Sequence, residues 1–191
     1  MKILILFAHP AFHKSRVNKV LVDGLSDHKG VTFHDLYDHY PEFDIDVEHE
    51  QELLSQHDCI IFHYPLFWYS TPAIIKEWQD LVLEHGWAYG SNGNALKGKL
   101  FFCAITTGGP ELAYKVGSFN NHTLNQTAAL CQMIPLPPFV VHGTHAIEND
   151  GILDYKNDYY KILQEIIDEK IDKEKASKLK YLNDYLMKEK V

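Results

Sequence analysis

The stretch FAHPAFHKSRVN places hydrogen-bonding side chains directly after a run of hydrocarbon, where they could hold an anion. Ser15 is a favourable N-cap, so Arg16, Val17 and Asn18 are predicted to form the first turn of a helix. The free N–H groups of that turn attract an anion, and His9 adds a side-chain donor. Because the stretch contains neither GxGxxG nor GxxxxGK[ST], it favours a single phosphate or short pyrophosphate over a dinucleotide or triphosphate. A capped helix without a ligand is the structural alternative.

Aromatic side chains crowd a second segment, PLFWYSTP, which begins at Pro65. A flat conjugated ring could stack on these side chains, while backbone N–H groups of the same loop meet its heteroatoms. Core packing accounts for an apolar residue such as Leu66, but it does not account for so many aromatic residues at one turn. The predicted wall consists of Pro65, Leu66, Phe67, Trp68 and Tyr69.

A third segment, TTGGP, combines hydroxyl groups with paired glycines. Glycines let a backbone approach a ligand closely and turn its N–H groups toward developing negative charge. Little periodicity follows, and an irregular loop of this length is usually functional, although an ordinary surface loop is the alternative. The three segments together correspond to a phosphate seat, a ring-stacking wall and a cap over the polar edge of the ring, which are the needs of a flavin nucleotide. The candidates in the third segment and its loop are Thr106, Thr107, Gly108, Gly109, Tyr114 and Asn120.

Short apolar or β-branched stretches precede each of these segments and are typical of strands covered on both faces. Segments with helical spacing lie between them, as in Val17, Val20, Leu21 and Leu25. Strand and helix therefore alternate, which predicts a doubly wound α/β sheet with helices on both faces. The predicted strands are Ile3–Ala8, Val31–Leu36, Cys59–Tyr64, Leu100–Thr106 and Phe139–His142, and a second clear helical pattern covers 74–82.

The whole chain, residues 1–191, is predicted to form one domain with a C-terminal helical extension from about residue 172. Apolar residues recur at helical spacing between Tyr155 and Val191, amid many Lys and Glu. This pattern predicts one packing helix followed by a more solvated, partly frayed one. A contact with another subunit is the alternative role of this stretch.

Composition argues against several classes of function. The net charge is −8 and no basic block is present, so nucleic acid is a poor partner. The apolar start is too short for a signal peptide, and no stretch is long enough to span a bilayer. Cys59, Cys103 and Cys131 form no CxxC and are expected to be small buried hydrophobes in a reduced cytoplasm. The twelve histidines contain no HExxH pair, so no metal site is predicted.

The three segments resemble those of the flavodoxin-like NAD(P)H:quinone oxidoreductases related to DT-diaphorase. The similarity covers about residues 1–150, and the order and spacing of the motifs carry it. Bacterial ancillary subunits of glutathione-gated potassium-efflux systems resemble the chain further, in DLYDHYPEFDID (35–46) and LPPFVVHGT (136–144). The shared stretches are AHPAFHKSRVN (8–18), PLFWYSTPAIIKEW (65–78), HGWAYG (85–90) and TTGGPELAY (106–114).

This resemblance implies a five-stranded parallel sheet in the order 2-1-3-4-5 and a homodimer with a flavin at each subunit boundary. The first segment matches positions that hold the flavin phosphate and ribityl chain, and the matching residues are His9, Ser15, Arg16, Val17 and Asn18. The aromatic segment matches the wall along the isoalloxazine ring, and the TTGG segment matches the loop at its pyrimidine edge. The loop 86–99 is expected to reach toward the site of the other subunit, or else to be a mobile surface loop.

Two residues are candidates for a catalytic role by the same resemblance. Tyr114 matches a tyrosine that helps to stabilise the reduced flavin in the diaphorases. Asn120 stands where those enzymes carry a histidine, and an amide cannot take up a proton at neutral pH. Stabilisation of the flavin anion is therefore expected to depend on Tyr114 and on the backbone donors of Gly108 and Gly109.

The expected activity is two-electron, ping-pong transfer of hydride from NAD(P)H through a bound flavin to a quinone or related acceptor. FMN is favoured over FAD by the resemblance to the efflux ancillary subunits and because the sequence shows no dedicated adenine pocket. The alternative is a regulatory subunit that docks on a glutathione-gated potassium/proton antiporter and activates it. The expected location is the cytoplasm, including the inner face of the cell membrane. A one-electron carrier is disfavoured, because an aromatic wall beside an open slot serves the stacking of a second ring.

Overall fold

The computed structural model describes residues 1–114 and 122–189, so the predicted role of Asn120 lies outside the described residues. All strand pairs are parallel, and the strand order β2-β1-β3-β4-β5, with β6 also paired to β4, confirms the predicted doubly wound fold. The strands are β1 (Ile3–Phe7), β2 (Val31–Asp35), β3 (Cys59–Pro65), β4 (Leu100–Thr106), β5 (Ile134–Pro135) and β6 (Phe139–Val141).

The fifth position in the sheet, beside β4, is occupied by two short strands instead of one, which the sequence did not predict. β5 pairs with the start of β4, and β6 pairs with its end. Pro137 and Pro138 stand between them, and proline has no N–H to donate to a ladder. Leu136 N–H lies in the gap and donates to the Phe101 carbonyl oxygen at 2.8 Å.

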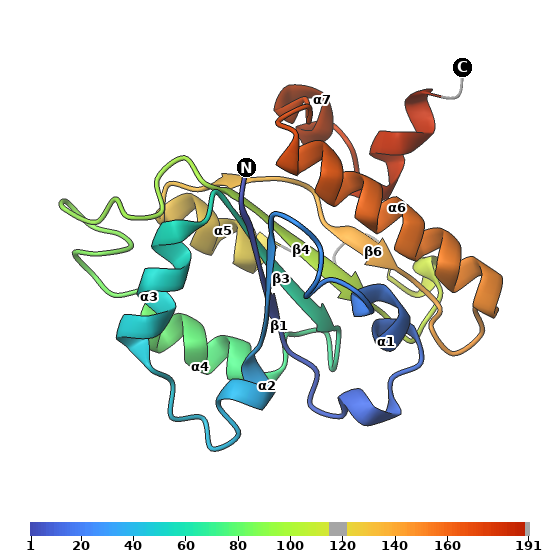
Figure 1. Ribbon diagram of the computed structural model, residues 1–191, viewed down its shortest axis with the longest axis horizontal. Coiled ribbons are helices and arrows are strands. Elements are labelled where there is room, and N and C mark those ends of the chain that lie inside the picture. The colour runs from blue at the N-terminus through green and yellow to red at the C-terminus, as the bar shows by residue number, and fades with distance from the viewer. Residues whose placement is uncertain (115–121, 190–191) are drawn as a thin grey trace.

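Helices cover both faces of the sheet, as Figure 1 shows. Helices α3, α4 and α5 pack on one face, while α1 and α6 pack on the other. None of the described helices is long and apolar enough to cross a membrane. The α-helices are α1 (Val17–Val22), α2 (Leu36–His39), α3 (Val47–Gln56), α4 (Ala73–Val82), α5 (His122–Leu130), α6 (Asn149–Ile167) and α7 (Lys173–Ser177), and the 3-10 helices are η1 (Phe12–Lys14), η2 (Glu111–Ala113) and η3 (Leu182–Glu189).

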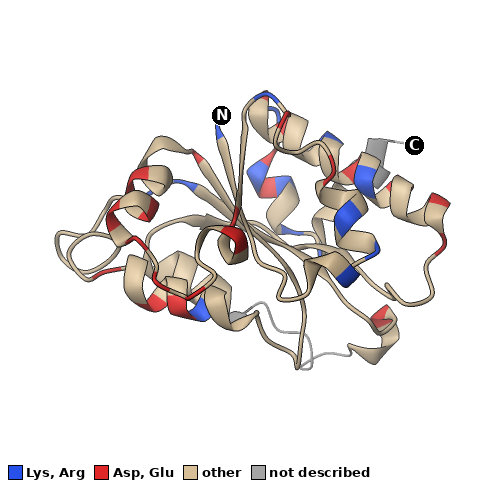
Figure 2. Ribbon diagram, turned by 60° about the horizontal axis from the view of Figure 1, so that its bottom comes forward, with Lys and Arg blue, Asp and Glu red and all other residues tan. Residues whose placement is uncertain are grey.

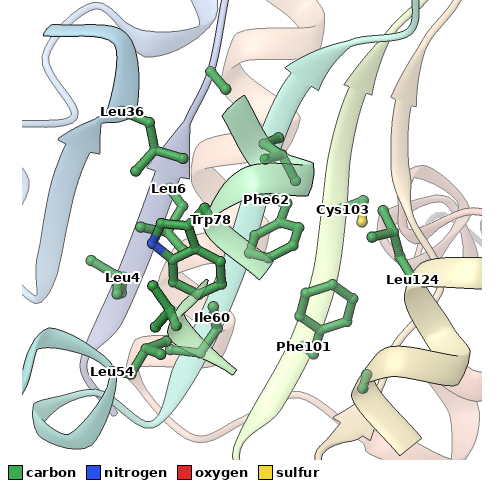
Figure 3. Close-up of a cluster of buried hydrophobic side chains, with 14 of the residues drawn as sticks. Leu4, Leu6, Leu36, Leu54, Ile60, Phe62, Trp78, Phe101, Cys103 and Leu124 are labelled. Carbon is green, nitrogen blue, oxygen red and sulfur yellow. The ribbon is translucent and has the colours of Figure 1, made fainter. Parts of the chain in front are cut away.

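Alternate residues of the central strands supply the two cores, because side chains of a strand point to opposite faces in turn. Leu4 and Leu6 belong to the core under α3, α4 and α5, whereas Ile3 and Ile5 belong to the core under α1 and α6. Figure 3 shows the first core, in which the Trp78 ring meets Phe62 edge to face at 5.5 Å. The three cysteines are buried, as predicted.

The first core contains one buried carboxylate, that of Glu50 on α3. It accepts hydrogen bonds from Trp78 Nε1 (2.7 Å) and Tyr40 OH (2.6 Å), and it pairs with His34 Nε2 (2.7 Å). Burial on its own would raise the pKa of Glu50, but hydrogen bonds from these partners outweigh it and lower the pKa. The ionised carboxylate therefore ties β2, α3 and α4 together.

The same side of the molecule is acidic on its surface. Between Lys29 and Lys76 the sequence has many Asp and Glu and no Lys or Arg. Figure 2 shows red segments gathered over this side, while blue and red alternate on α6 and the C-terminal part.

The C-terminal part folds back onto the second core. Helix α6 begins at Asn149, earlier than the predicted packing helix, and buries Tyr159 and Leu163. Beyond α7, Leu182 and Tyr185 are also buried in this core. The tail is thus packed through its apolar side chains rather than extended into solvent.

Replacing Glu50 with Gln is expected to lower the free energy of unfolding by about 2–4 kcal/mol at neutral pH, because an amide cannot accept from three buried donors. Since the folded-state pKa of Glu50 is depressed, its contribution is present above the unfolded-state pKa and is lost as pH falls through the folded-state pKa. Urea unfolding across acidic pH should therefore show a shallower loss for Glu50→Gln than for the wild type. The exposed Glu52→Gln on the same helix is the control and should behave as the wild type.

Candidate functional site

A cavity of about 600 Å³ lies at the carboxyl ends of β1, β3 and β4, within the size range of small-molecule sites. It brings together residues from all three predicted segments. Tyr69, Thr107 and Gly109 lie beside this cavity rather than on its wall. The predicted residues that line it are His9, Ser15, Arg16, Val17, Asn18, Pro65, Leu66, Phe67, Trp68, Thr106, Gly108 and Tyr114.

The buried amide of Asn18 joins the ends of the three strands. Its Nδ2 donates to Ser15 Oγ at 3.1 Å and to Thr106 Oγ1 at 3.0 Å. Its Oδ1 lies 3.1 Å from Nε2 of His63, on β3. Both amide hydrogens are thus used inside the protein, so Asn18 acts on the cavity through Ser15 and Thr106 rather than through its own donors.

His63 fixes which way the Asn18 amide points. Burial, reinforced by the charge of His9, lowers the pKa of His63 to about 3, so the ring is neutral. Among the described residues no partner faces His63 Nδ1. An orphaned lone pair costs less than an orphaned N–H, so the proton belongs on Nε2, which then donates to Asn18 Oδ1.

The orientation of Asn18 in turn makes Ser15 a donor. Ser15 Oγ accepts from both the backbone N–H and the side-chain Nδ2 of Asn18, each at 3.1 Å. Both lone pairs are then occupied, so the hydroxyl of Ser15, which lines the cavity, keeps one hydrogen to donate. Helix α1 begins at Val17 with Arg16 as its N-cap, one residue later than predicted, and Ser15 Oγ accepts from the N–H of Asn18 in its first turn.

Positive charge gathers at the same end of the cavity. The Arg16 guanidinium turns to the loop after β6, where it donates to Asn149 Oδ1 and to the carbonyl oxygens of Thr144 and Ile147. These acceptors are neutral, so the Arg16 charge still acts on the cavity. Lys14 adds a second cation to the wall, and His9 accepts from Ala11 N–H at its Nδ1, which leaves Nε2 to donate.

The aromatic segment forms a tight two-residue turn. Phe67 and Ser70 exchange backbone hydrogen bonds of 3.2 and 3.0 Å around Trp68 and Tyr69. Both central residues have positive φ, 51° and 61°, a region that such turns normally fill with Asn and Gly. The Trp68 side chain is 95% exposed and that of Tyr69 is 68% exposed. Two large rings held out in a strained conformation indicate a ligand-contacting role.

Tyr69 turns toward a neighbouring cavity of about 460 Å³, which Leu66 separates from the first. Tyr89 of the loop 86–99 lines the same space from the side of α4. Tyr69 also meets the ring of Tyr114 edge to face, with centroids 6.3 Å apart. The aromatic turn therefore borders two adjacent spaces.

Backbone hydrogen bonds from the end of β6 and the loop after it hold the third segment in place. Thr107 N–H donates to the Val141 carbonyl at 2.9 Å, and Gly143 N–H donates to the Gly109 carbonyl at 2.8 Å. Gly109 N–H points to Tyr114 OH at 3.3 Å, and a Cβ on Gly109 would also lie only 3.3 Å from that hydroxyl. The glycine thus lets Tyr114 close over the segment.

The sequence reasoning missed several relevant residues, among them Lys14 on the cavity wall. Thr144 and His145 line the cavity from the loop after β6, and His142 stacks on Tyr114 with centroids 5.6 Å apart. His63 lies beneath Asn18. The rule that ligand sites occupy the carboxyl ends of parallel strands could have pointed to the β6 loop, whereas nothing local marks His63 inside an apolar strand.

The arrangement brings to one cavity the donors and positive charge of the first segment, the exposed rings of the aromatic turn, and Gly108 of the glycine segment. Such a site suits a planar ring that carries an anionic tail. Together with the strand order, it defines the chain as a flavodoxin-like doubly wound protein. The chain belongs to the flavodoxin-like fold family, whose sequence model matches residues 1–163.

Known relatives agree with this assignment. The glutathione-regulated potassium-efflux system ancillary protein KefG of Cronobacter sakazakii is 47% identical over 148 residues, or 74% of this chain and 80% of that protein. General stress protein 14 of Treponema denticola, solved in complex with FMN, superposes with a TM-score of 0.80 at 35% identity and covers 86% of this chain and 98% of its own. An NADPH-quinone reductase from P. pentosaceus superposes with a TM-score of 0.76 at 31% identity, and the match covers 85% of this chain and 97% of that protein.

The double variant Trp68→Asn/Tyr69→Gly is expected to raise the free energy of unfolding by about 1 kcal/mol, because it places residues that tolerate positive φ in the turn. Chemical denaturation measures this. Trp68→Ala/Tyr69→Ala is the matched control, since it removes the same rings but keeps two Cβ atoms in the left-handed region. Equal stability of the two double variants would contradict the assignment of strain to the turn.

Proposed function

We propose that the protein is a flavin-dependent oxidoreductase that passes electrons from NAD(P)H to a quinone or related acceptor. The observation that carries this proposal is the single cavity into which three loops bring an anion-binding end, an aromatic wall and a glycine-rich edge. The quinone reductase and the FMN-bound protein among its relatives support the same class. The site residues are proposed on the geometry of this chain.

FMN is the favoured cofactor, because the donor set suits one terminal phosphate. The Ser15 hydroxyl, the free N–H groups of Arg16 and Val17, and the charge of Lys14 would hold that phosphate. His9 and Thr106 lie further along the same wall, within reach of a ribityl chain. Leu66, Phe67 and Trp68 would lie along the ring, with Gly108 at its polar edge.

A bound flavin would supply hydride acceptance from a nicotinamide and reduction of an acceptor at the same face. The protein's own contribution is to orient and to stabilise charge. The exposed rings of Phe67 and Trp68 would align a second flat molecule, which lowers the entropy cost of transfer. Tyr114 and the backbone N–H of Gly108 would stabilise negative charge at the ring edge, whereas Gly109 N–H already donates to Tyr114 OH.

A homodimer belongs to the same proposal. The slot beside Trp68 is open in one chain, and a second subunit would help to enclose it. In the single chain, the side chains of Trp87 and Tyr89 pack partly against the core of their own subunit. The other face of the loop 86–99 would then be available to cover the partner's site.

A second candidate role is regulatory, and the similarity to KefG favours it. In this role the protein docks on the cytoplasmic side of a glutathione-gated potassium/proton antiporter, at the inner face of the membrane, and activates it. The two roles are compatible in one protein. Coelution of the purified protein with such an antiporter, and stimulated potassium efflux, would distinguish docking from turnover.

The purified protein is expected to be yellow, or to become yellow on adding FMN, and to bleach with NADH or NADPH. A quinone should then restore the colour, because the same cavity accepts the second ring after the nicotinamide leaves. Visible spectra recorded anaerobically with each donor measure both steps. A protein that is colourless once unbound flavin has been removed after incubation with FMN or FAD refutes the enzyme proposal.

Ser15→Ala is expected to weaken binding of FMN about tenfold or more, because it removes a donor to a charged phosphate. Riboflavin, which lacks the phosphate, should bind Ser15→Ala as it binds the wild type. Asn18→Ala should share this phenotype, since Asn18 orients Ser15, and should also lower stability. Ser55→Ala on α3 is the matched control, and fluorescence titration gives the dissociation constants. An equal loss of affinity for FMN and for riboflavin would contradict the proposal that Ser15 binds the phosphate.

A further inference from the structure

The C-terminal tail returns to the sheet edge that borders the candidate site. The family match ends at residue 163, before α7 and η3. Figure 1 shows these red segments beside α6, and η3 packs against both α6 and β6. The function proposed above gives this part of the chain no role.

Asn183 of the tail covers the exposed edge of β6. Its Oδ1 accepts from Val140 N–H at 2.9 Å, and its Nδ2 donates to the Val140 carbonyl at 3.0 Å. One side-chain amide therefore replaces the neighbouring strand that an edge lacks. Leu182 N–H donates to the Pro138 carbonyl at 2.9 Å, which fixes the tail along the same edge.

A row of hydrogen bonds then runs from the tail to the glycine segment. Tyr181 OH lies 3.3 Å from His142 Nε2, and His142 Nδ1 lies 2.9 Å from Thr107 Oγ1. Thr107 Oγ1 also donates to the Gly109 carbonyl at 3.0 Å. The row therefore ends on the carbonyl of the peptide between Gly109 and Pro110.

The direction of each bond follows from the acceptor at the end of the row. A carbonyl can only accept, so the single Thr107 hydroxyl hydrogen points to Gly109, and Thr107 must accept from His142 Nδ1–H. His142 Nε2 then carries a lone pair, which accepts the Tyr181 hydroxyl hydrogen. Burial lowers the pKa of His142, against an opposing effect of Glu111, which agrees with a neutral ring.

Tyr181 also faces the Glu111 carboxylate, which pairs with Lys180 at 2.7 Å and whose pKa that pair lowers. If the Tyr181 hydroxyl turned to Glu111, His142 would have to donate from Nε2 and take the Thr107 hydrogen at Nδ1. The Thr107–Gly109 bond would then be lost from a buried hydroxyl. The contacts of the row, from Tyr181 through His142 and Thr107 to Gly109, are formed together only when Tyr181 donates to His142, and Glu111 then keeps its pair with Lys180.

We propose that residues 180–183 form a strap that positions the glycine segment for its ligand, with Tyr181 as the positioning residue. The strap holds β6 through Asn183 and orients the Gly109 peptide through His142 and Thr107. Its effect on flavin binding rests on the proposed function. Its effect on the segment itself does not.

Tyr181→Phe keeps the ring and removes one hydrogen bond, so it tests the strap with little risk to folding. We expect amide hydrogen exchange of the peptide 106–114 to become faster in the flavin-free protein. We also expect FMN and lumiflavin, the ring without ribityl phosphate, to bind about three- to tenfold more weakly by the same factor. The visible band shape of bound FMN should shift toward that of free FMN.

Tyr185→Phe is the matched control, because Tyr185 OH accepts from Asp172 N–H inside the tail and touches no part of the glycine segment. It should leave exchange of 106–114 unchanged and flavin affinity within about twofold. The strap is overturned if Tyr181→Phe behaves as the wild type, if Tyr185→Phe has the same effects, or if only FMN and not lumiflavin binds more weakly. If the wild type binds no flavin, the proposed function fails, and hydrogen exchange alone decides the strap.

Discussion

The burial of the Asn18 amide is the constraint on which the geometry of the candidate site depends. An amide removed from water must find partners for two hydrogens and an oxygen, or its desolvation goes uncompensated. Here the partners come from three loop-bearing strands, through Ser15, His63 and Thr106. Satisfying one residue therefore sets the relative position of three segments and the direction in which the Ser15 hydroxyl points. The polar groups that line the cavity are therefore positioned by the hydrogen bonds that the buried Asn18 amide requires.

The buried parts of the central strands stabilise the fold, whereas the loops just beyond their carboxyl ends form the candidate site. Apart from His63 and Thr106 near their carboxyl ends, β1, β3 and β4 are apolar on both faces, and the carboxylate of Glu50 is compensated by three partners within the core. Just beyond the carboxyl ends, the chain holds Trp68 and Tyr69 at positive φ with their rings in solvent. The packed sheet keeps that turn in place although its conformation is unfavourable, so the core supports an arrangement that local preference alone would not form.

The sequence predicts those parts of the molecule that depend on local pattern. Continuous apolar runs identify β1, β3 and β4, because a strand buried on both faces needs no alternation. The cavity loops follow from the same runs, since they are the segments that come next. The division of the fifth position between two short strands was not predicted, because the run Phe139–His142 hides the pairing of Ile134 across two prolines. The roles of His63 and His142 were also missed, because each depends on partners more than thirty residues away.

The two short strands at the fifth position also explain why the tail and the third segment are coupled. Pro137 and Pro138 shorten β6 to three residues, so the strand that supports Thr107 has few ladder bonds of its own. Its outer edge would then lie open directly beside the glycine segment. Asn183 supplies the missing pair at Val140, and Tyr181 continues from the same turn of chain to His142 at the end of β6. The returning tail therefore compensates for the short edge strand. Both are needed to hold the backbone of the third segment in place.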